Sequence, residues 1–246
     1  MSRFAITAPR RATGIPTLPV LPRLPVLALA LAAVVMAFTA RPAAADGDKA
    51  AESYISDLAV ETLEVLSDPQ RSHADKTGAF RRLLVTNTAI ERFGRSALGQ
   101  YSRLPTDSEF DEYVDALEDY AVMLLYSRFS LFADHSIEVT GSEVVERRTT
   151  TYVVVPTEVR DPAHSLVATV QWILLKEDSG YRIFDIRVQT PSESATFSLL
   201  STQRDEFTQI LRTNGRDMAA LINFLRENSS IPAPQDRDAA LTELTQ

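Results

Sequence analysis

The chain has 246 residues, 45% of them hydrophobic, and a formal net charge of −8 at pH 7. This acidic balance argues against nucleic acid as a partner and against adsorption to an anionic bilayer, so any lipid contact would have to be enclosed. Because the chain has no cysteine, it has no disulfides or thiolate metal ligands, and a hydrophobic core must stabilise the fold.

The first 45 residues have the pattern of a secretory signal peptide. Four arginines lie before or at the start of an apolar run over residues 24–39, and Ala43-Ala44-Ala45 offers a small-residue cleavage site. The run of roughly 16 apolar residues is short for a permanent membrane span, which needs about 20. We therefore expect residues 1–45 to be a cleavable signal peptide, residues 46–228 to form one domain and residues 229–246 to be a flexible tail.

Helical periodicity dominates the first half of the expected domain. Apolar residues recur at helical spacing over residues 50–66, from residue 75 onward and over residues 89–98. The longest predicted helix begins after Pro105, with Thr106 or Asp107 as its N-cap and acidic residues in its first turn.

From Ile137 the hydrophobic period changes to two, which predicts strands. Four strands are predicted, over residues 137–145, 147–159, 166–176 and 181–189. Short turns between them favour hairpins in an antiparallel sheet, and Pro156, which lacks an amide proton, is expected at an edge or a bulge. Two further helices are predicted over residues 196–213 and 216–227, so the fold class is α+β.

Few residues indicate catalysis or metal binding. The three histidines, His73, His135 and His164, are each isolated from other ligand types at helical spacing. The sequence contains no Gly-x-Ser-x-Gly elbow, His-Glu-x-x-His motif or Gly-rich phosphate loop. The acidic residues between Asp107 and Asp119 fall mostly on the solvent face of their helix. We interpret the protein as a non-enzyme without metal or cofactor.

An ordered set of segments carries a resemblance to a known family. The segments are Phe80-Arg81-Arg82-Leu83-Leu84, Ala97-Leu98-Gly99-Gln100-Tyr101, Val170-Gln171-Trp172, Gly180-Tyr181-Arg182-Ile183-Phe184-Asp185-Ile186 and Ile210-Leu211-Arg212-Thr213-Asn214-Gly215-Arg216-Asp217. Together they resemble the MlaC, or toluene-tolerance, family of periplasmic phospholipid-binding proteins. The chain departs from the family pattern where Ser102 replaces a tryptophan and Ile173 a basic residue, and Thr196-Phe197-Ser198-Leu199 is the counterpart of a Gly-Val-Ser-Leu turn.

The resemblance implies an NTF2-like fold, in which helices wrap a curved, mostly antiparallel, four-stranded sheet and enclose an apolar cavity. It implies a soluble, monomeric periplasmic carrier that shuttles phospholipid between the outer and inner membranes. The implied partners are the phospholipid itself, an inner-membrane MCE-type ABC transporter complex and an outer-membrane lipoprotein complex. Enclosure is physically reasonable, since hiding about 30 acyl methylenes gains roughly 0.8 kcal/mol each.

Under this hypothesis, eight apolar residues are expected to contact the acyl chains: Leu117, Leu124, Val153, Val155, Val170, Trp172, Phe184 and Ile186. For each of them, ordinary core packing is the alternative. Asp185 interrupts an apolar strand and is expected to be a structural partner of an arginine or a backbone amide. Two other functions stay open, a carrier of another amphiphile such as a hopanoid and a non-carrier NTF2-like module, either an interaction module or an enzyme.

Overall fold

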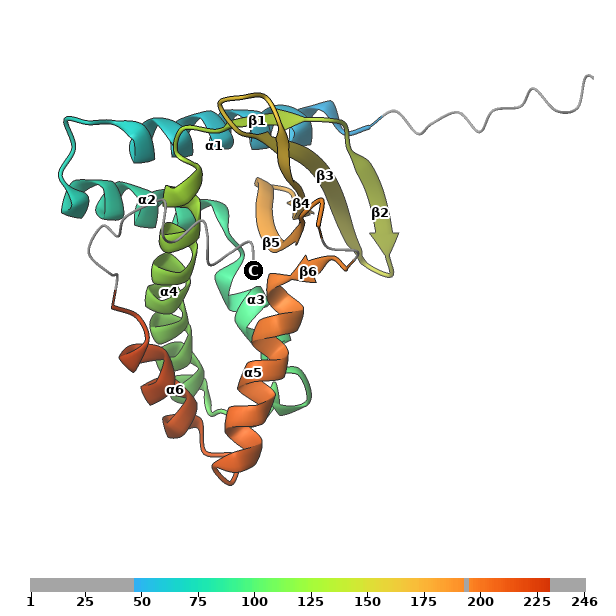
Figure 1. The fold of residues 1–246 in the computed structure, drawn as a ribbon. Coiled ribbons are helices and arrows are strands. Elements are labelled where there is room, and N and C mark those ends of the chain that lie inside the picture. The colour runs from blue at the N-terminus through green and yellow to red at the C-terminus, as the bar shows by residue number, and fades with distance from the viewer. Residues whose placement is uncertain (1–46, 193–194, 231–246) are drawn as a thin grey trace, which may run out of the picture. The chain divides into compact units, whose positions relative to one another are not determined.

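The computed structural model describes residues 47–192 and 195–230 (Figure 1). In chain order the elements of this part are α1 (Lys49–Ser67), α2 (His73–Asn87), α3 (Ile90–Ala97), the 3₁₀ turn η2 (Gly99–Tyr101), α4 (Asp107–Phe129), the 3₁₀ turn η3 (Ser130–Phe132), β1 (Ser136–Val139), β2 (Glu143–Arg147), β3 (Thr150–Arg160), β4 (Leu166–Glu177), β5 (Gly180–Gln189), β6 (Phe197–Ser198), α5 (Leu199–Thr213) and α6 (Met218–Glu227). The predicted α+β class, with helices around an antiparallel sheet, is confirmed.

Side-chain caps define where the α-helices other than α3 begin. Thr106 is the N-cap of α4, and it forms a capping box with Glu109, in which each side chain bonds the other residue's backbone amide. The expected start of this helix is therefore confirmed. α2 starts at His73, two residues earlier than predicted, because the hydroxyl of Ser72 caps it at the amide of Asp75. α6 starts two residues later, at Met218, with Asp217 as its N-cap, after Arg216 takes a left-handed conformation.

The described sheet has six strands instead of the predicted four, all antiparallel, in the order β1-β3-β4-β5-β6 with β2 also paired to β3. The segment predicted as one strand over residues 137–145 divides into β1 and β2. The division lies opposite Pro156, whose carbonyl accepts a hydrogen bond from the amide of Thr140 but which has no amide proton to return. Pro156 thus lies at an irregularity in the pairing, as expected.

The sixth strand comes from the segment that was predicted to begin the fifth helix. Phe197 and Ser198 pair with Val188 and Arg187, and the helix begins only at Leu199. Ser198 is the N-cap, because its hydroxyl accepts a hydrogen bond from the amide of Ser201 at 3.1 Å.

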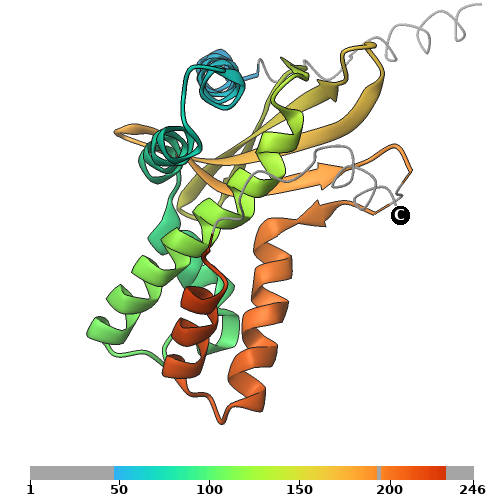
Figure 2. The same cartoon turned by 60° about the vertical axis from the view of Figure 1, so that its left-hand side comes forward.

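Two hydrophobic clusters lie at opposite ends of α4. One cluster lies between α1, α2, the C-terminal part of α4 and one face of the sheet, which we call the core face. The other joins α3, the N-terminal part of α4, α5 and α6 into a helical bundle, which extends away from the sheet (Figures 1 and 2). The bundle is closely packed, and Leu98, Leu211, Leu221 and Leu225 are fully buried in it.

Candidate functional site

An apolar cavity lies between the core face of the sheet and the α1–α2 pair, which forms its roof. It contains about 660 Å³ of empty space, counting the part that opens to solvent. Its lining residues are Ile55, Leu58, Ala59, Thr62, Leu63, Phe80, Leu83, Leu84, Asn87, Thr88, Leu125, Phe129, Phe132, Ile137, Trp172, Ile183 and Ile186. None of these is charged, so the cavity suits an apolar ligand.

Trp172 on β4 forms part of the cavity wall on the sheet side. Its ring lies nearly parallel to that of Phe129, with centroids 6.1 Å apart. The indole Nε1 donates a hydrogen bond to the hydroxyl of Thr157 at 3.1 Å, and that hydroxyl in turn donates to the carbonyl of Val170. The indole N–H is therefore satisfied within the sheet, and the ring contributes apolar surface to the cavity.

Two of the three polar lining residues are also engaged in hydrogen bonds. Asn87 accepts from the hydroxyl of Tyr54 at 2.8 Å and donates to the carbonyl of Leu83 at 2.8 Å. The hydroxyl of Thr88 donates to the carbonyl of Leu84. These two side chains are neighbours at the C-terminus of α2, whereas the third polar lining residue, Thr62, belongs to α1.

A β-bulge decides which side chains of β5 reach the cavity. The register between β4 and β5 shifts so that Ile173 pairs with Asp185 and Leu174 with Ile183, which leaves Phe184 as the extra residue. Ile183 therefore faces the cavity, whereas the ring of Phe184 contacts that of Tyr152, 5.7 Å away. Tyr152 neighbours the core-facing Val153 in the strand, so it and Phe184 lie on the opposite face of the sheet.

The eight residues expected at the acyl chains separate into four places. Trp172 and Ile186 line the cavity. Val153, Val155 and Val170 are buried in the same hydrophobic cluster but do not line it. The structure places the other three elsewhere: Leu117 and Leu124 in the helical bundle and Phe184 on the opposite face of the sheet.

Most of the cavity wall comes from residues that the sequence reasoning did not select. α1 contributes Ile55, Leu58 and Leu63, and α2 contributes Phe80 and Leu84. Both helices carry an apolar stripe in the sequence, and that stripe was the available signal. The stripe did not identify a cavity, because a helix that packs on a filled core has the same sequence pattern as one that covers a cavity.

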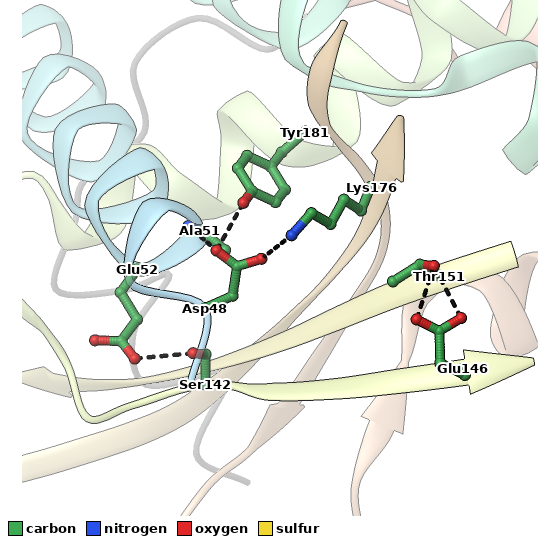
Figure 3. A network of polar contacts seen from close by, with 8 residues as sticks. All are labelled: Asp48, Ala51, Glu52, Ser142, Glu146, Thr151, Lys176 and Tyr181. Atoms are coloured by element: carbon green, nitrogen blue, oxygen red, sulfur yellow. Dashed lines mark hydrogen bonds and ion pairs between the residues drawn. The ribbon is translucent and has the colours of Figure 1, made fainter. Parts of the chain in front are cut away.

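A polar network fixes the N-terminus of α1 to the sheet (Figure 3). Asp48 caps the helix at the amide of Ala51 and accepts hydrogen bonds from Lys176 and Tyr181, both at 2.7 Å. Burial alone would raise the pKa of Asp48, but these hydrogen bonds and the charge of Lys176 outweigh it and lower the pKa to about 2. Next to it, Ser142 donates a hydrogen bond to Glu52 at 2.8 Å.

The roof has a second polar attachment, from α2 to α4. Arg81 pairs with Glu118, at 2.9 Å, and with Asp119. All three side chains are partly exposed, so each pair contributes about 1 kcal/mol or less. The roof is therefore held by apolar contacts and peripheral polar bonds.

Asp185 has the structural role expected of it. Its side chain is 3% exposed and accepts hydrogen bonds from the amides of Ile186 and Leu200, the hydroxyl of Ser198 and the guanidinium of Arg187. Leu200 lies in the first turn of α5, where a carboxylate is favourable. Asp185 thereby fixes the start of α5 to β5.

Two of the three histidines lie close to aromatic rings, His73 to that of Tyr126 and His135 to that of Phe132. The Nδ1 atom of His73 lies 3.3 Å from the hydroxyl of Tyr126, and that of His135 lies 2.9 Å from a carboxylate oxygen of Asp134. Within residues 47–192 and 195–230, no group of three or more histidine or acidic side chains is placed to hold a metal ion. In the same ranges, no helix combines the length and the apolarity that crossing a membrane requires.

Comparison with known proteins gives one family and one fold. The family model described as MlaC protein matches residues 56–227. A phospholipid-binding protein from Ralstonia solanacearum, solved in complex with a phospholipid, is similar in structure, with a TM-score of 0.59 and 15% sequence identity. The alignment covers 73% of this chain and 96% of the other. No curated protein sequence matches significantly.

Proposed function

The chain belongs to the MlaC family, and from this we propose that it is a carrier that holds a phospholipid by its acyl chains in the cavity beneath α1 and α2. The cavity itself is the observation that carries the proposal. Its wall is apolar, and Asn87, Thr88 and Trp172 have their polar atoms bonded to the protein, which suits acyl chains and offers little to a polar substrate. The structural neighbour from Ralstonia, described as a phospholipid-binding protein, supports this choice of ligand.

The wider role follows the family. We propose that residues 1–45, which lie outside the described residues, direct export to the periplasm and are removed. The remaining chain, a domain over residues 46–228 with a tail to residue 246, would then carry lipid as a monomer. Its partners would be an outer-membrane lipoprotein complex and an inner-membrane MCE-type ABC transporter, for which it would be the substrate-binding component. Neither catalysis nor a cofactor has a part in this role, since phospholipid is the cargo.

The direct test is native mass spectrometry of the protein purified from periplasm without detergent, followed by lipid extraction. A diacyl phospholipid at a ratio near one to one is the expected result. A bound hopanoid would show that the carrier's ligand is another amphiphile and not a phospholipid. A lipid-free mass that stays unchanged after incubation with phospholipid vesicles would overturn the carrier proposal and favour a non-carrier module.

A cavity-filling variant makes the test specific to the site. Ala59 lines the cavity from α1, and its neighbour Val60 is 54% exposed. Ala59→Phe adds a ring where acyl chains would lie, so we expect at least a tenfold loss of copurified lipid. Val60→Phe makes a similar addition on the exposed side of the helix and should keep its lipid. If Ala59→Phe folds normally and retains as much lipid as Val60→Phe, the ligand lies elsewhere.

A further inference from the structure

The α1–α2 roof is fixed to the sheet at its two chain ends. At the start of α1, the side chain of Asp48 is 8% exposed and bonds Lys176 and Tyr181. After the end of α2, the amide of Ala89 donates to the carbonyl of Ile183 at 2.9 Å. Separating either end from the sheet would break a backbone bond or leave a buried carboxylate unpaired, so both ends resist opening.

The other end of the roof is the turn between its two helices. This turn, residues 68–72, lies away from the sheet, and residues 69–72 are exposed (Figure 1). The ion pair of Asp68 with Arg71 is local to the turn, and the bond from Lys76 to the carbonyl of Leu66 joins the two helices to each other. The roof is therefore bonded to the sheet at one end and exposed to solvent at the other.

α2 meets the rest of the protein along its contact with α4, which we call the α2–α4 seam. Among the described residues, the polar contacts across the seam join side chains: Arg81 with Glu118 and Asp119, and the hydroxyl of Tyr126 with His73. The Arg81 pairs are partly exposed, so water can replace them at little cost. Within the described ranges, α2 is thus held against α4 without backbone pairing or a buried charge.

The same seam is part of the cavity wall. Phe80 precedes Arg81 in α2, is 4% exposed and lines the cavity. Its ring contacts those of Tyr126 and Phe129 on α4, with centroids 5.6 and 6.1 Å away, and Phe129 also lines the cavity. A movement of α2 away from α4 would separate Phe80 from Phe129 and open the cavity there. Acyl chains that pass between the rings would cover the apolar surface that the movement exposes.

We propose that lipid enters and leaves the cavity through the α2–α4 seam, and that Arg81 is the latch that keeps the seam closed. α2 swings on its C-terminal end, where Ala89 stays bonded to Ile183, and the turn at residues 68–72 moves outward. This inference rests on the proposed function, since it adds the route by which the same cavity is loaded and emptied.

The first test locks the seam with a cleavable crosslinker. Because the chain has no cysteine, a bismaleimide with an internal disulfide reacts only at introduced sites. Arg81→Cys with Glu118→Cys is loaded with a phosphatidylglycerol that carries a pyrene-labelled acyl chain and is then crosslinked. Fluorescence follows the transfer of this lipid to unlabelled vesicles. We expect the crosslink to slow transfer at least about tenfold, and reduction of the crosslinker to restore the rate.

The matched control places the same crosslinker at the fixed end of the roof. Glu52→Cys with Ser142→Cys replaces a side-chain hydrogen bond of 2.8 Å between α1 and the residue before β2. Its transfer rate should stay within about twofold of the rate without the crosslink, because this end does not move. A locked seam that releases lipid at the full rate, or equal slowing by both crosslinks, would overturn the inference.

The second test removes the latch and leaves the cavity lining unaltered. Glu118→Gln with Asp119→Asn deprives Arg81 of both carboxylates, so we expect transfer to become about three- to tenfold faster. Glu112→Gln is the control on the same helix, since it loses a similarly exposed pair with Arg226 outside the seam and should keep the unaltered rate. If the double variant transfers lipid no faster than this control, Arg81 is not the latch.

The loading step separates this inference from the proposed function. If the unaltered protein takes up no labelled lipid and carries none from the periplasm, both are wrong. If it binds the labelled lipid near one to one and the locked seam does not slow transfer, the cavity stands as the binding site and the entry route is wrong.

Discussion

At the scale of single residues, Gly94 shows how closely α3 approaches α4. A Cβ atom at this position would lie 2.9 Å from Leu117 Cδ2 and 3.1 Å from the ring of Tyr113. The hydroxyl of Tyr113 also donates to the carbonyl of Gly94 at 3.2 Å. The helices can therefore pack this closely only around a glycine.

We predict that Gly94→Ala lowers the free energy of unfolding by about 1–3 kcal/mol, because the bundle must shift to admit the methyl group. Gly78→Ala is the control. It lies within α2, where the nearest atom to a new Cβ is the mobile end of Arg82 at 3.8 Å, so it should gain about 0.5–1 kcal/mol. Urea denaturation measures both, and a stabilising Gly94→Ala would contradict the packing described.

The sequence could predict the role of a single residue only where neighbouring residues in the chain decide that role. Asp185 stood out because a carboxylate within an apolar strand needs partners, and it has them. Phe184 was expected at the acyl chains because strict alternation places it on the same face as Ile186. The bulge that turns it away depends on the pairing of β5 with β4, which no pattern within β5 reveals.

At the scale of elements, one carboxylate links the N-terminus of α1 to the sheet. Asp48 caps the helix and binds Lys176 and Tyr181 (Figure 3). Its pKa is about 2 in the folded protein against an ordinary value of 3.8. Because the pKa is lowered on folding, the charged carboxylate stabilises the fold above about pH 4, and this contribution is lost as the pH falls toward 2.

We predict that Asp48→Ala costs about 1–2 kcal/mol at pH 7, through loss of the cap and the ion pair. Asp48→Asn keeps one oxygen for the cap and Tyr181, but it loses the charge and the second oxygen, which accepts from Lys176. Its deficit relative to the unaltered protein should be constant from pH 7 to 5 and shrink below pH 4. Glu61→Gln, on the exposed side of the same helix, should stay within about 0.5 kcal/mol. A deficit of Asp48→Asn that does not change with pH would refute the role of the charge.

Element boundaries could be predicted where a cap or a turn residue marks them. The capping box at Thr106 has a sequence signature, and the predicted start of α4 is confirmed. β6 has no such signal, because Phe197 and Ser198 precede an amphipathic helix and read as its first turn. They form a strand because β5 lies alongside and Asp185 bonds Ser198.

At the scale of the whole described domain, one hydrophobic cluster is filled by side chains and the other borders a cavity. The helical bundle holds fully buried leucines such as Leu221, whereas the cavity wall includes half-buried residues such as Leu84. The sequence shows two sets of apolar stripes and cannot distinguish these clusters, since only the distance between α1, α2 and the sheet decides whether side chains meet. A lipid carrier needs this difference, because a filled core cannot admit acyl chains.

The difference predicts how each cluster responds to truncation in the lipid-free protein. Leu221→Ala opens a hole in a packed core and should cost about 2–5 kcal/mol of unfolding free energy. Leu84→Ala only enlarges an existing cavity. It should therefore cost about 1 kcal/mol, which is nearer the transfer free energy of the removed carbon atoms alone, since these are only partly buried. Adding phospholipid should widen the deficit of Leu84→Ala and leave that of Leu221→Ala unchanged, because only Leu84 would contact the chains. Equal costs in the lipid-free protein would mean that the roof closes onto the sheet in solution and that no cavity exists there.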